Sequence, residues 1–275
     1  MTPPTDAAVL GGITAESKEY FEKRSLKKGV VNWVLLMSLG IAYVISGDFS
    51  GWNYGIGYGG WFGMLIAFLV MGAMYLFMVL GLAEMSSAMP AAGAGYGFAR
   101  RAMGKVGGAL TGFAILIEYT ICPAAISTFI AAYVHALGLF ADIPSVAIIG
   151  FFFIVFVGIH LIGVGEALKI VFGITAIAMV ALIAFVVGIA PHFEVANLFN
   201  IAPAVDGGTA LLPFGVAGVI SALPFGIWLF LAVEGVPLAA EESANPKKDM
   251  PKGIIGAILT LMVTGALVLF LTAGG

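Results

Sequence analysis

Two short stretches decide the interpretation of this chain: Ser46-Gly47-Asp48-Phe49-Ser50-Gly51 and Phe230-Leu231-Ala232-Val233-Glu234-Gly235. Each stretch places an acidic residue beside a glycine within an apolar segment. A carboxylate in a lipid-facing helix costs roughly 2.5 to 3.5 kcal/mol, so such a residue normally faces a partner or a transport path. Interrupted helices at matching places in two halves of a membrane protein are the best sequence indication of a transporter's binding site.

The composition sets the structural class. Of the 275 residues, 61% are hydrophobic and only 10% are charged, which excludes a soluble domain. A bilayer core of about 30 Å needs about 20 apolar helical residues, and uncharged runs at 61–83, 143–165, 170–191 and 253–275 are long enough. Barrel strands would instead alternate over about 10 residues. The sequence therefore predicts an all-α integral membrane protein.

We expect seven transmembrane helices, at residues 29–56, 60–84, 106–137, 143–164, 168–190, 212–240 and 252–275. The first and sixth contain the two interruptions. Residues 1–28 are polar and charged, which predicts a cytoplasmic N-terminal segment without a cleavable signal peptide. Residues 191–211 are expected to form an external loop.

Basic residues indicate the orientation. They cluster before the first span and in every second loop, for example at Arg100 and Arg101 and at Lys247 and Lys248. The positive-inside rule then predicts a multi-pass protein of the cytoplasmic (inner) membrane, with a cytoplasmic N-terminus and Gly275 outside. This orientation and the absence of lysine from 253–275 argue against a rhodopsin-like receptor.

The two interrupted helices enter the membrane from opposite sides, because five spans separate their starts. This arrangement is typical of an inverted repeat. Residues 29–190 would form the first repeat, and residues 212–275 would begin the second.

Several strings resemble the amino acid, polyamine and organocation transporter superfamily. The sixth-helix string Ala232-Val233-Glu234-Gly235 and the residues that follow at 240–246 are similar to that family, as are 81–85 and 90–96 after the second span. Residues 44–52 and 234–242 most resemble its ethanolamine permease branch. The resemblance implies a five-plus-five inverted-repeat fold with substrate between helices one, three, six and eight. Family members are longer, so we expect a fragment that lacks the remainder of the second repeat.

The expected substrate-binding residues are Ser46, Gly47, Asp48, Phe230, Ala232 and Glu234. Where a helix unwinds, its free N–H groups attract carboxylates and its free carbonyls attract cations. Asp48 would supply a counter-charge to a substrate ammonium and repel a substrate carboxylate. In the alternative interpretation, Asp48 only begins an external loop.

The other candidates also have two interpretations. Glu234 is expected to hydrogen-bond unwound backbone more than to touch substrate. The resemblance implies that Phe230 is an aromatic gate, although it could equally be a packing residue. Glu118, inside the third span, is a candidate proton carrier or a structural hydrogen-bonding residue.

The sequence does not decide whether the coupling ion is a proton or sodium. Some proton-driven relatives carry a lysine in helix five, but here the matching position lies near Ala178 and no basic residue follows Lys169 in that span. We expect no cofactor and no metal site, since no Cys/His spacing suits a metal. No nucleophile and base pair is present, so the chain is not predicted to be an enzyme.

The sequence thus predicts a secondary active transporter that imports ethanolamine or a similar small amine by alternating access. Its partners would be the small amine and membrane lipid, with no nucleic acid, and the oligomeric state is open. The alternatives are an amino acid permease of the same superfamily and, from other classes, a channel or a non-transporting sensor.

Overall fold

The structure is a computed structural model that describes residues 31–90, 93–162 and 164–275. The expected cytoplasmic segment 1–28 lies outside the described residues. Within them, the α-helices are α2 (Trp33–Phe49), α3 (Tyr54–Ala88), α4 (Ala94–Ala136), α5 (Ser145–Ile162), α6 (Val164–Ile189), α7 (Gly215–Ile227) and α8 (Pro246–Gly274). The 3-10 helices are η2 (Ala190–His192), η3 (Val195–Phe199) and η4 (Val233–Glu242). The described part of the chain contains no strand, which confirms the all-α prediction.

Four of these helices are long and apolar enough to cross a membrane: α3, α4, residues 169–192 and α8. Three others, α2, α5 and α7, are apolar but shorter. A multi-pass helical membrane protein therefore agrees with the structure. That all seven helices cross the bilayer, as parts of an inverted repeat, stays a prediction.

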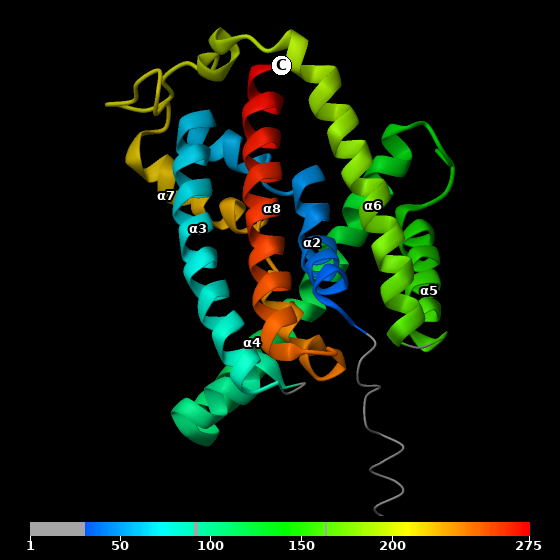
Figure 1. The fold of residues 1–275 in the computed structure, drawn as a ribbon. Coiled ribbons are helices and arrows are strands. Elements are labelled where there is room, and N and C mark those ends of the chain that lie inside the picture. Colours follow the sequence, from blue (N-terminus) through cyan, green and yellow to red (C-terminus); the bar gives the residue numbers. More distant parts are fainter. Residues whose placement is uncertain (1–30, 91–92, 163) are drawn as a thin grey trace, which may run out of the picture.

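A central group of helices forms the core (Figure 1). The most extensive contacts are those of α3 with α7 and of α2 with α8, and α3 also packs on α8. Fully buried side chains come from each of these helices, such as Leu36 of α2, Met64 of α3 and Ile258 of α8. This group holds both stretches with which the sequence analysis began.

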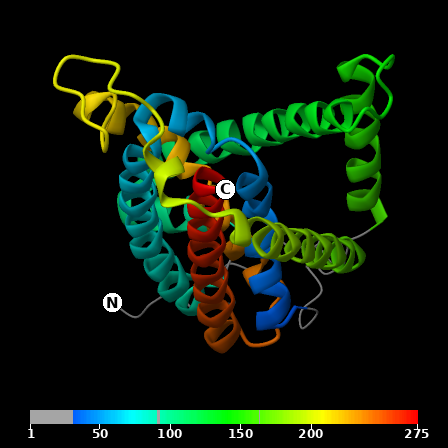
Figure 2. The same ribbon diagram turned by 90° about the horizontal axis from the view of Figure 1, so that it is seen from above.

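Helices α4, α5 and α6 enclose one side of the core less tightly. Seen from above, α4 runs outward, and α5 and α6 bring the chain back towards α2 (Figure 2). Large apolar side chains on them are exposed, for example Leu116, Ile154 and Val180. A surface this apolar suits lipid rather than water.

The end of α2 differs from the expected interruption within a span at 29–56. Helix α2 is continuous from Trp33 to Phe49, and α3 begins at Tyr54 after a short turn. Gly51 has a φ of +105°, a conformation that favours glycine and ends the helix. Helical structure resumes at Tyr54 inside the predicted span, and Gly60, with a φ of +70°, separates residues 54–59 from the rest of α3. That the two helical segments on either side of residues 50–53 form one interrupted span stays a prediction.

Helix six is interrupted, as the sequence predicted. Helix α7 ends at Ile227, residues 228–232 form a turn, and η4 begins at Val233. Ala232 adopts a φ of +77°, which is uncommon for a residue with a side chain. The interruption lies inside the predicted span 212–240.

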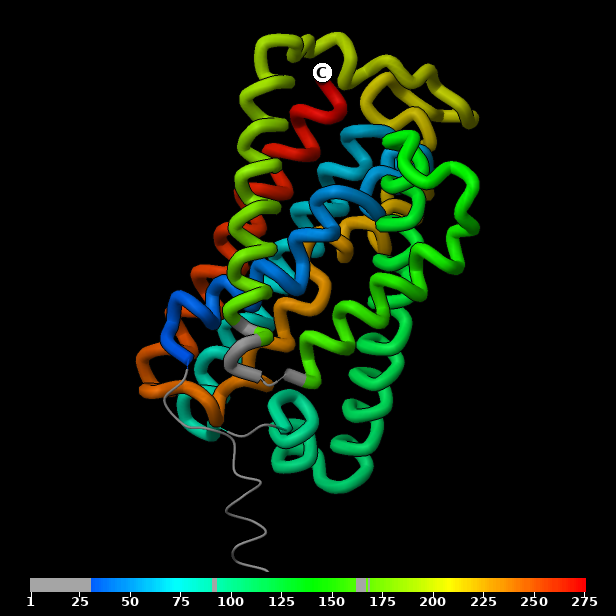
Figure 3. Tube along the Cα trace, turned by 90° about the vertical axis from the view of Figure 1, so that its right-hand side faces the viewer, coloured from blue at the N-terminus to red at the C-terminus, as the bar shows by residue number. Residues whose placement is uncertain are grey.

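A parallel β-bridge joins the start of α2 to the end of η4. The Val31 amide donates to the Glu242 carbonyl at 3.2 Å, and the Ala244 amide donates to the Val31 carbonyl at 3.1 Å. Figure 3 shows the start of α2 in blue close to the orange segment that leads into α8. The start of α2 and the end of η4 are thus tied together at one end of the core.

A substitution at Gly40 tests the packing of α2 against α8. A Cβ atom at this position would lie 2.7 Å from Ala257 Cβ and 2.9 Å from Val236 Cγ2. We expect Gly40→Ala to lower the free energy of unfolding by about 1–3 kcal/mol, because overpacking forces neighbouring atoms apart. The measurement is denaturant unfolding in detergent.

The matched control is Gly81→Ala in α3, where a Cβ atom meets nothing within 4 Å. This variant should be as stable as the wild type, or more stable by up to about 1 kcal/mol. Equal stabilities for the two variants would contradict the close approach of α2 and α8.

Candidate functional site

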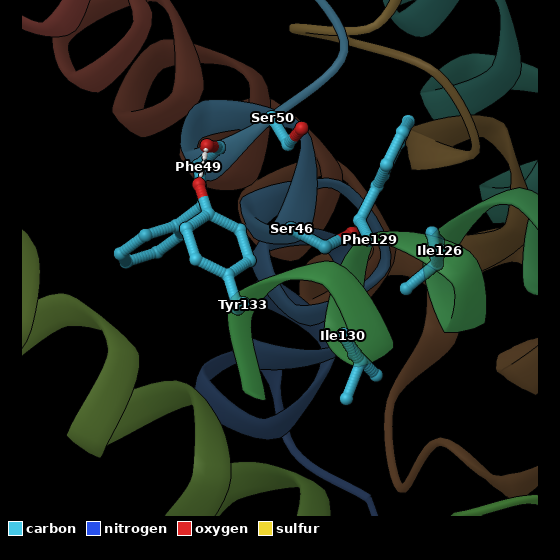
Figure 4. Close-up of a pocket in the computed structure, with 7 residues that line it drawn as sticks. All are labelled: Ser46, Phe49, Ser50, Ile126, Phe129, Ile130 and Tyr133. Atoms are coloured by element: carbon cyan, nitrogen blue, oxygen red, sulfur yellow. Dashed lines mark hydrogen bonds between the residues drawn. The ribbon is translucent and has the colours of Figure 1, made fainter. Parts of the chain in front are cut away.

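An outer pocket of about 230 Å³ lies between the end of α2 and α4 (Figure 4). Its lining is Ser46, Phe49, Ser50, Ile126, Phe129, Ile130 and Tyr133. Three of these residues supply hydroxyl groups and the others are apolar. The Tyr133 hydroxyl donates a hydrogen bond to the Phe49 carbonyl, which ties α4 to the last turn of α2.

A smaller inner pocket, of about 20 Å³, adjoins the outer one. Ser46 and Ile126 line both pockets. The other residues of the inner pocket are Tyr43, Val44, Gly47, Cys122, Trp228, Leu231 and Ala232. The two pockets therefore form one site where α2, α4 and the interruption of helix six meet.

Two aromatic rings lie at the junction of the pockets. Phe129 lines the outer pocket, Trp228 lines the inner one, and their centroids are 5.9 Å apart at an interplanar angle of 65°. This edge-to-face geometry is one that aromatic pairs favour. Movement of either ring would change the connection between the two pockets.

The interruption of helix six approaches α2 very closely at Gly47. A Cβ atom at Gly47 would overlap the carbonyl oxygen of Trp228, so no larger residue fits. Gly51 is also close, since its Cβ would lie 3.1 Å from the Trp228 ring. These glycines set the position of Trp228 in the site.

The two α-helix ends around the site have a common polarity. Helix α2 ends at Phe49 and α7 ends at Ile227, next to Trp228, so both present carboxyl-terminal ends near the pockets. Such ends carry partial negative charge and favour cations. The Ala232 amide in the interruption instead donates to Glu234 Oε1 at 3.2 Å. The amino-terminal end of η4 also borders the inner pocket at Ala232, but because that amide is bonded to Glu234, the two carboxyl-terminal ends are left to favour a positive group.

Of the six residues predicted to bind substrate, the structure places Ser46, Gly47 and Ala232 in the pocket lining. The other three line neither pocket. Asp48 is 3% exposed and lies next to Thr264 of α8, on a different side of α2. The contact between Asp48 and substrate stays a prediction.

Phe230 is fully buried in the core. Its ring stacks on Phe68 with centroids 5.3 Å apart and packs near Tyr75 at 5.8 Å, both on α3. The structure therefore favours the packing interpretation of Phe230, and the gate role is not supported by its position. Trp228, two residues earlier, is the aromatic residue that borders the pockets.

Glu234 contacts backbone within the interruption, as the hydrogen bond from Ala232 shows. Its carboxyl group also lies against that of Glu118 on α4. One oxygen of each carboxyl is buried without a hydrogen-bond partner. The structure thus joins Glu118 to Glu234, and a proton-carrying role for Glu118 stays a prediction.

The sequence analysis missed the residues that α4 contributes. Cys122, Ile126, Phe129, Ile130 and Tyr133 recur at spacings of three or four, which place them on one helix face. The other faces of α4 are also apolar, so this spacing could not be separated from lipid-facing surface. Only the packing of α4 on α2 distinguishes the face that lines the site.

The hydrogen bond of Glu234 leads to a stability prediction. Glu234→Gln keeps an oxygen acceptor for the Ala232 amide, so its free energy of unfolding should stay within about 0.5 kcal/mol of the wild type. Glu234→Leu leaves the amide without this partner and should lose about 1–3 kcal/mol. Denaturant unfolding in detergent compares the two, and a leucine variant as stable as the glutamine variant would contradict a supporting role.

Comparison with known proteins identifies one family over most of the chain. The model of the amino acid permease family matches residues 34–274. An uncharacterized transporter of Rhizobium meliloti is 28% identical over 244 residues, which cover 86% of this chain and 51% of the relative. The branched-chain amino acid permease BcaP of Bacillus subtilis is 26% identical over 218 residues, covering 73% of this chain and 45% of the relative.

A methylthioribose transporter of Bacillus subtilis is also similar, at 26% identity over 221 residues that cover 73% of this chain and 45% of the relative. The chain spans about half the length of these curated relatives. Because the family model covers most of the chain and the site lies at an interrupted membrane helix, this protein belongs to the amino acid permease family of membrane transporters.

Proposed function

We propose that the chain is part of a secondary active transporter that carries ethanolamine or a similarly small amine across the cytoplasmic membrane by alternating access. The observation that carries the proposal is the site between α2, α4 and the interrupted helix six, in a chain of the amino acid permease family. The cytoplasmic N-terminus and the external position of Gly275 belong to the same proposal.

The polarity of the site supports an amine. The residues that line the two described pockets include no charged side chain, so the helix ends dominate the local potential. The α-helix ends that border the site, those of α2 and α7, are carboxyl-terminal and favour an ammonium group, while the amide at the amino-terminal end of η4 already donates to Glu234. The hydroxyl groups of Ser46, Ser50 and Tyr43 supply hydrogen-bonding partners for a substrate hydroxyl.

The size of the site supports a small substrate. The outer pocket holds about 230 Å³, less than the roughly 300–1,000 Å³ of pockets that bind drug-sized ligands. This volume suits a single small molecule such as an amino alcohol or an amino acid.

The second candidate is an amino acid permease, which the family and the similarity to BcaP favour equally. An amino acid adds a carboxylate, which needs N–H donors. In the described interruption, the Ala232 amide already donates to Glu234. A bound amino acid would have to compete for that amide, so we place the amine first.

Uptake into proteoliposomes tests the two substrates. We expect saturable uptake of radiolabelled ethanolamine that an excess of unlabelled ethanolamine suppresses and that leucine suppresses much less. Leucine uptake that exceeds ethanolamine uptake would select the amino acid permease. Flux that never saturates would indicate a channel, and binding without uptake would indicate a sensor.

A substitution at Ile126 tests whether the pockets form the transport site, because Ile126 lines both pockets. Ile126→Trp should fill the site and lower initial uptake by about tenfold or more, equivalent to at least about 1.4 kcal/mol. The control is Ile121→Trp, because Ile121 lies on the same helix and is 60% exposed. If both variants took up substrate at similar rates, the pockets would not be the transport site.

A further inference from the structure

Asp48 is a buried acid that the proposed site does not use. It is 3% exposed, and neither of its carboxyl oxygens has a hydrogen-bond partner. It lines neither described pocket, although its neighbour Gly47 lines the inner one. Unpartnered buried charge is strongly unfavourable, so this arrangement requires an explanation.

The donors around Asp48 are directed elsewhere. The indole Nε1 of Trp52 donates to the backbone carbonyl of Asp48 at 3.1 Å, not to its carboxyl group. Thr264 of α8 lies beside the carboxyl group, and its hydroxyl donates to the Leu261 carbonyl at 3.3 Å. The Thr264 oxygen thus keeps capacity to accept a hydrogen bond. The polar side chain beside the Asp48 carboxyl group is thus directed at a backbone carbonyl and not at the carboxyl oxygens.

This pattern fits a neutral carboxylic acid better than a carboxylate. A protonated aspartate has one O–H to donate, and Thr264 can accept it. A carboxylate only accepts, and removal of its charge from water without a partner costs several kcal/mol. Among the described residues, no charged or other titratable side chain interacts with Asp48, from α8, α3 or the interruption of helix six.

We propose that Asp48, with Thr264 as its hydrogen-bond acceptor, is the proton-binding site of this transporter. A proton needs no cavity, whereas a metal ion needs several oxygen ligands around it. The proposal rests on the proposed function and names its coupling ion as H⁺.

The position of Asp48 explains how the proton and the substrate are linked. Ser46 and Gly47 line the pockets in the same helical turn in which Asp48 faces α8. Only the neutral acid fits the close packing of α2 on α8, so loss of the proton favours a conformation in which Asp48 reaches water. Protonation and the shape of the site are therefore coupled through one turn of α2.

Infrared difference spectroscopy tests the proton site without any transport. The chain is reconstituted in lipid and titrated between about pH 5 and pH 9, across the range in which unperturbed aspartate is fully ionised. We expect a carboxylic-acid C=O absorption at neutral pH that includes a band from Asp48, and that band should be lost in Asp48→Asn, while any band from the Glu118 and Glu234 pair stays. The control Glu84→Gln changes an exposed acid of α3 and should keep the band. Absence of the band from the wild type at neutral pH would overturn the proposal.

Uptake measurements test the coupling. Wild-type uptake should rise several-fold when the side that supplies substrate is acidified, and a proton ionophore should abolish accumulation. In Asp48→Asn the ratio of uptake at low pH to uptake at high pH should fall to about one. Glu84→Gln should keep the wild-type ratio.

Two results would overturn the coupling. Accumulation that requires sodium and ignores the proton ionophore would assign the coupling to sodium. Loss of pH dependence in Glu118→Gln, with Asp48→Asn unchanged, would place the proton on the Glu118 and Glu234 pair. If the wild type takes up no amine or amino acid, the proposed function fails, while the infrared titration still decides the state of Asp48.

Discussion

A helix that ends inside a membrane must find partners for its free backbone groups, and most of this site follows from that requirement. At the end of α2, Trp52 donates to the Asp48 carbonyl and Tyr133 donates to the Phe49 carbonyl. At the interruption of helix six, Glu234 accepts from the Ala232 amide. Trp52 and Glu234 lie within four residues of the groups they satisfy, whereas Tyr133 comes from α4, so its hydrogen bond also joins two sides of the site.

The same requirement gives the site its polarity. At the interruption, the Ala232 amide already donates to the carboxyl group of Glu234. Two carboxyl-terminal helix ends remain beside the pockets. A substrate ammonium can then be bound by carbonyl partial charges without a charged side chain in the lining. Asp48 lies on another side of the helix, next to Thr264 of α8.

Close approach is the second requirement. Gly47 allows the Trp228 carbonyl to rest on α2, and Gly40 allows α2 to pack on α8. These contacts bring the pockets and Asp48 within one helical turn of each other. A small displacement of α2 would therefore alter the pockets and the surroundings of Asp48 together, and the proposed coupling of proton and substrate depends on this proximity.

The sequence by itself determined the helical membrane class and the interruption of helix six. Both follow from local features of the sequence: the length of the apolar runs and the glycine next to Glu234. It also indicated Ser46, Gly47 and Ala232, which line the pockets. It could not decide which way Asp48 faces or that Phe230 is buried on α3, since both depend on how helices distant in sequence pack. Only the tertiary structure decided that α2 ends at Phe49 and which face of α4 lines the site. In an almost uniformly apolar chain, hydrophobic periodicity does not separate the faces of a helix, and contacts between helices do.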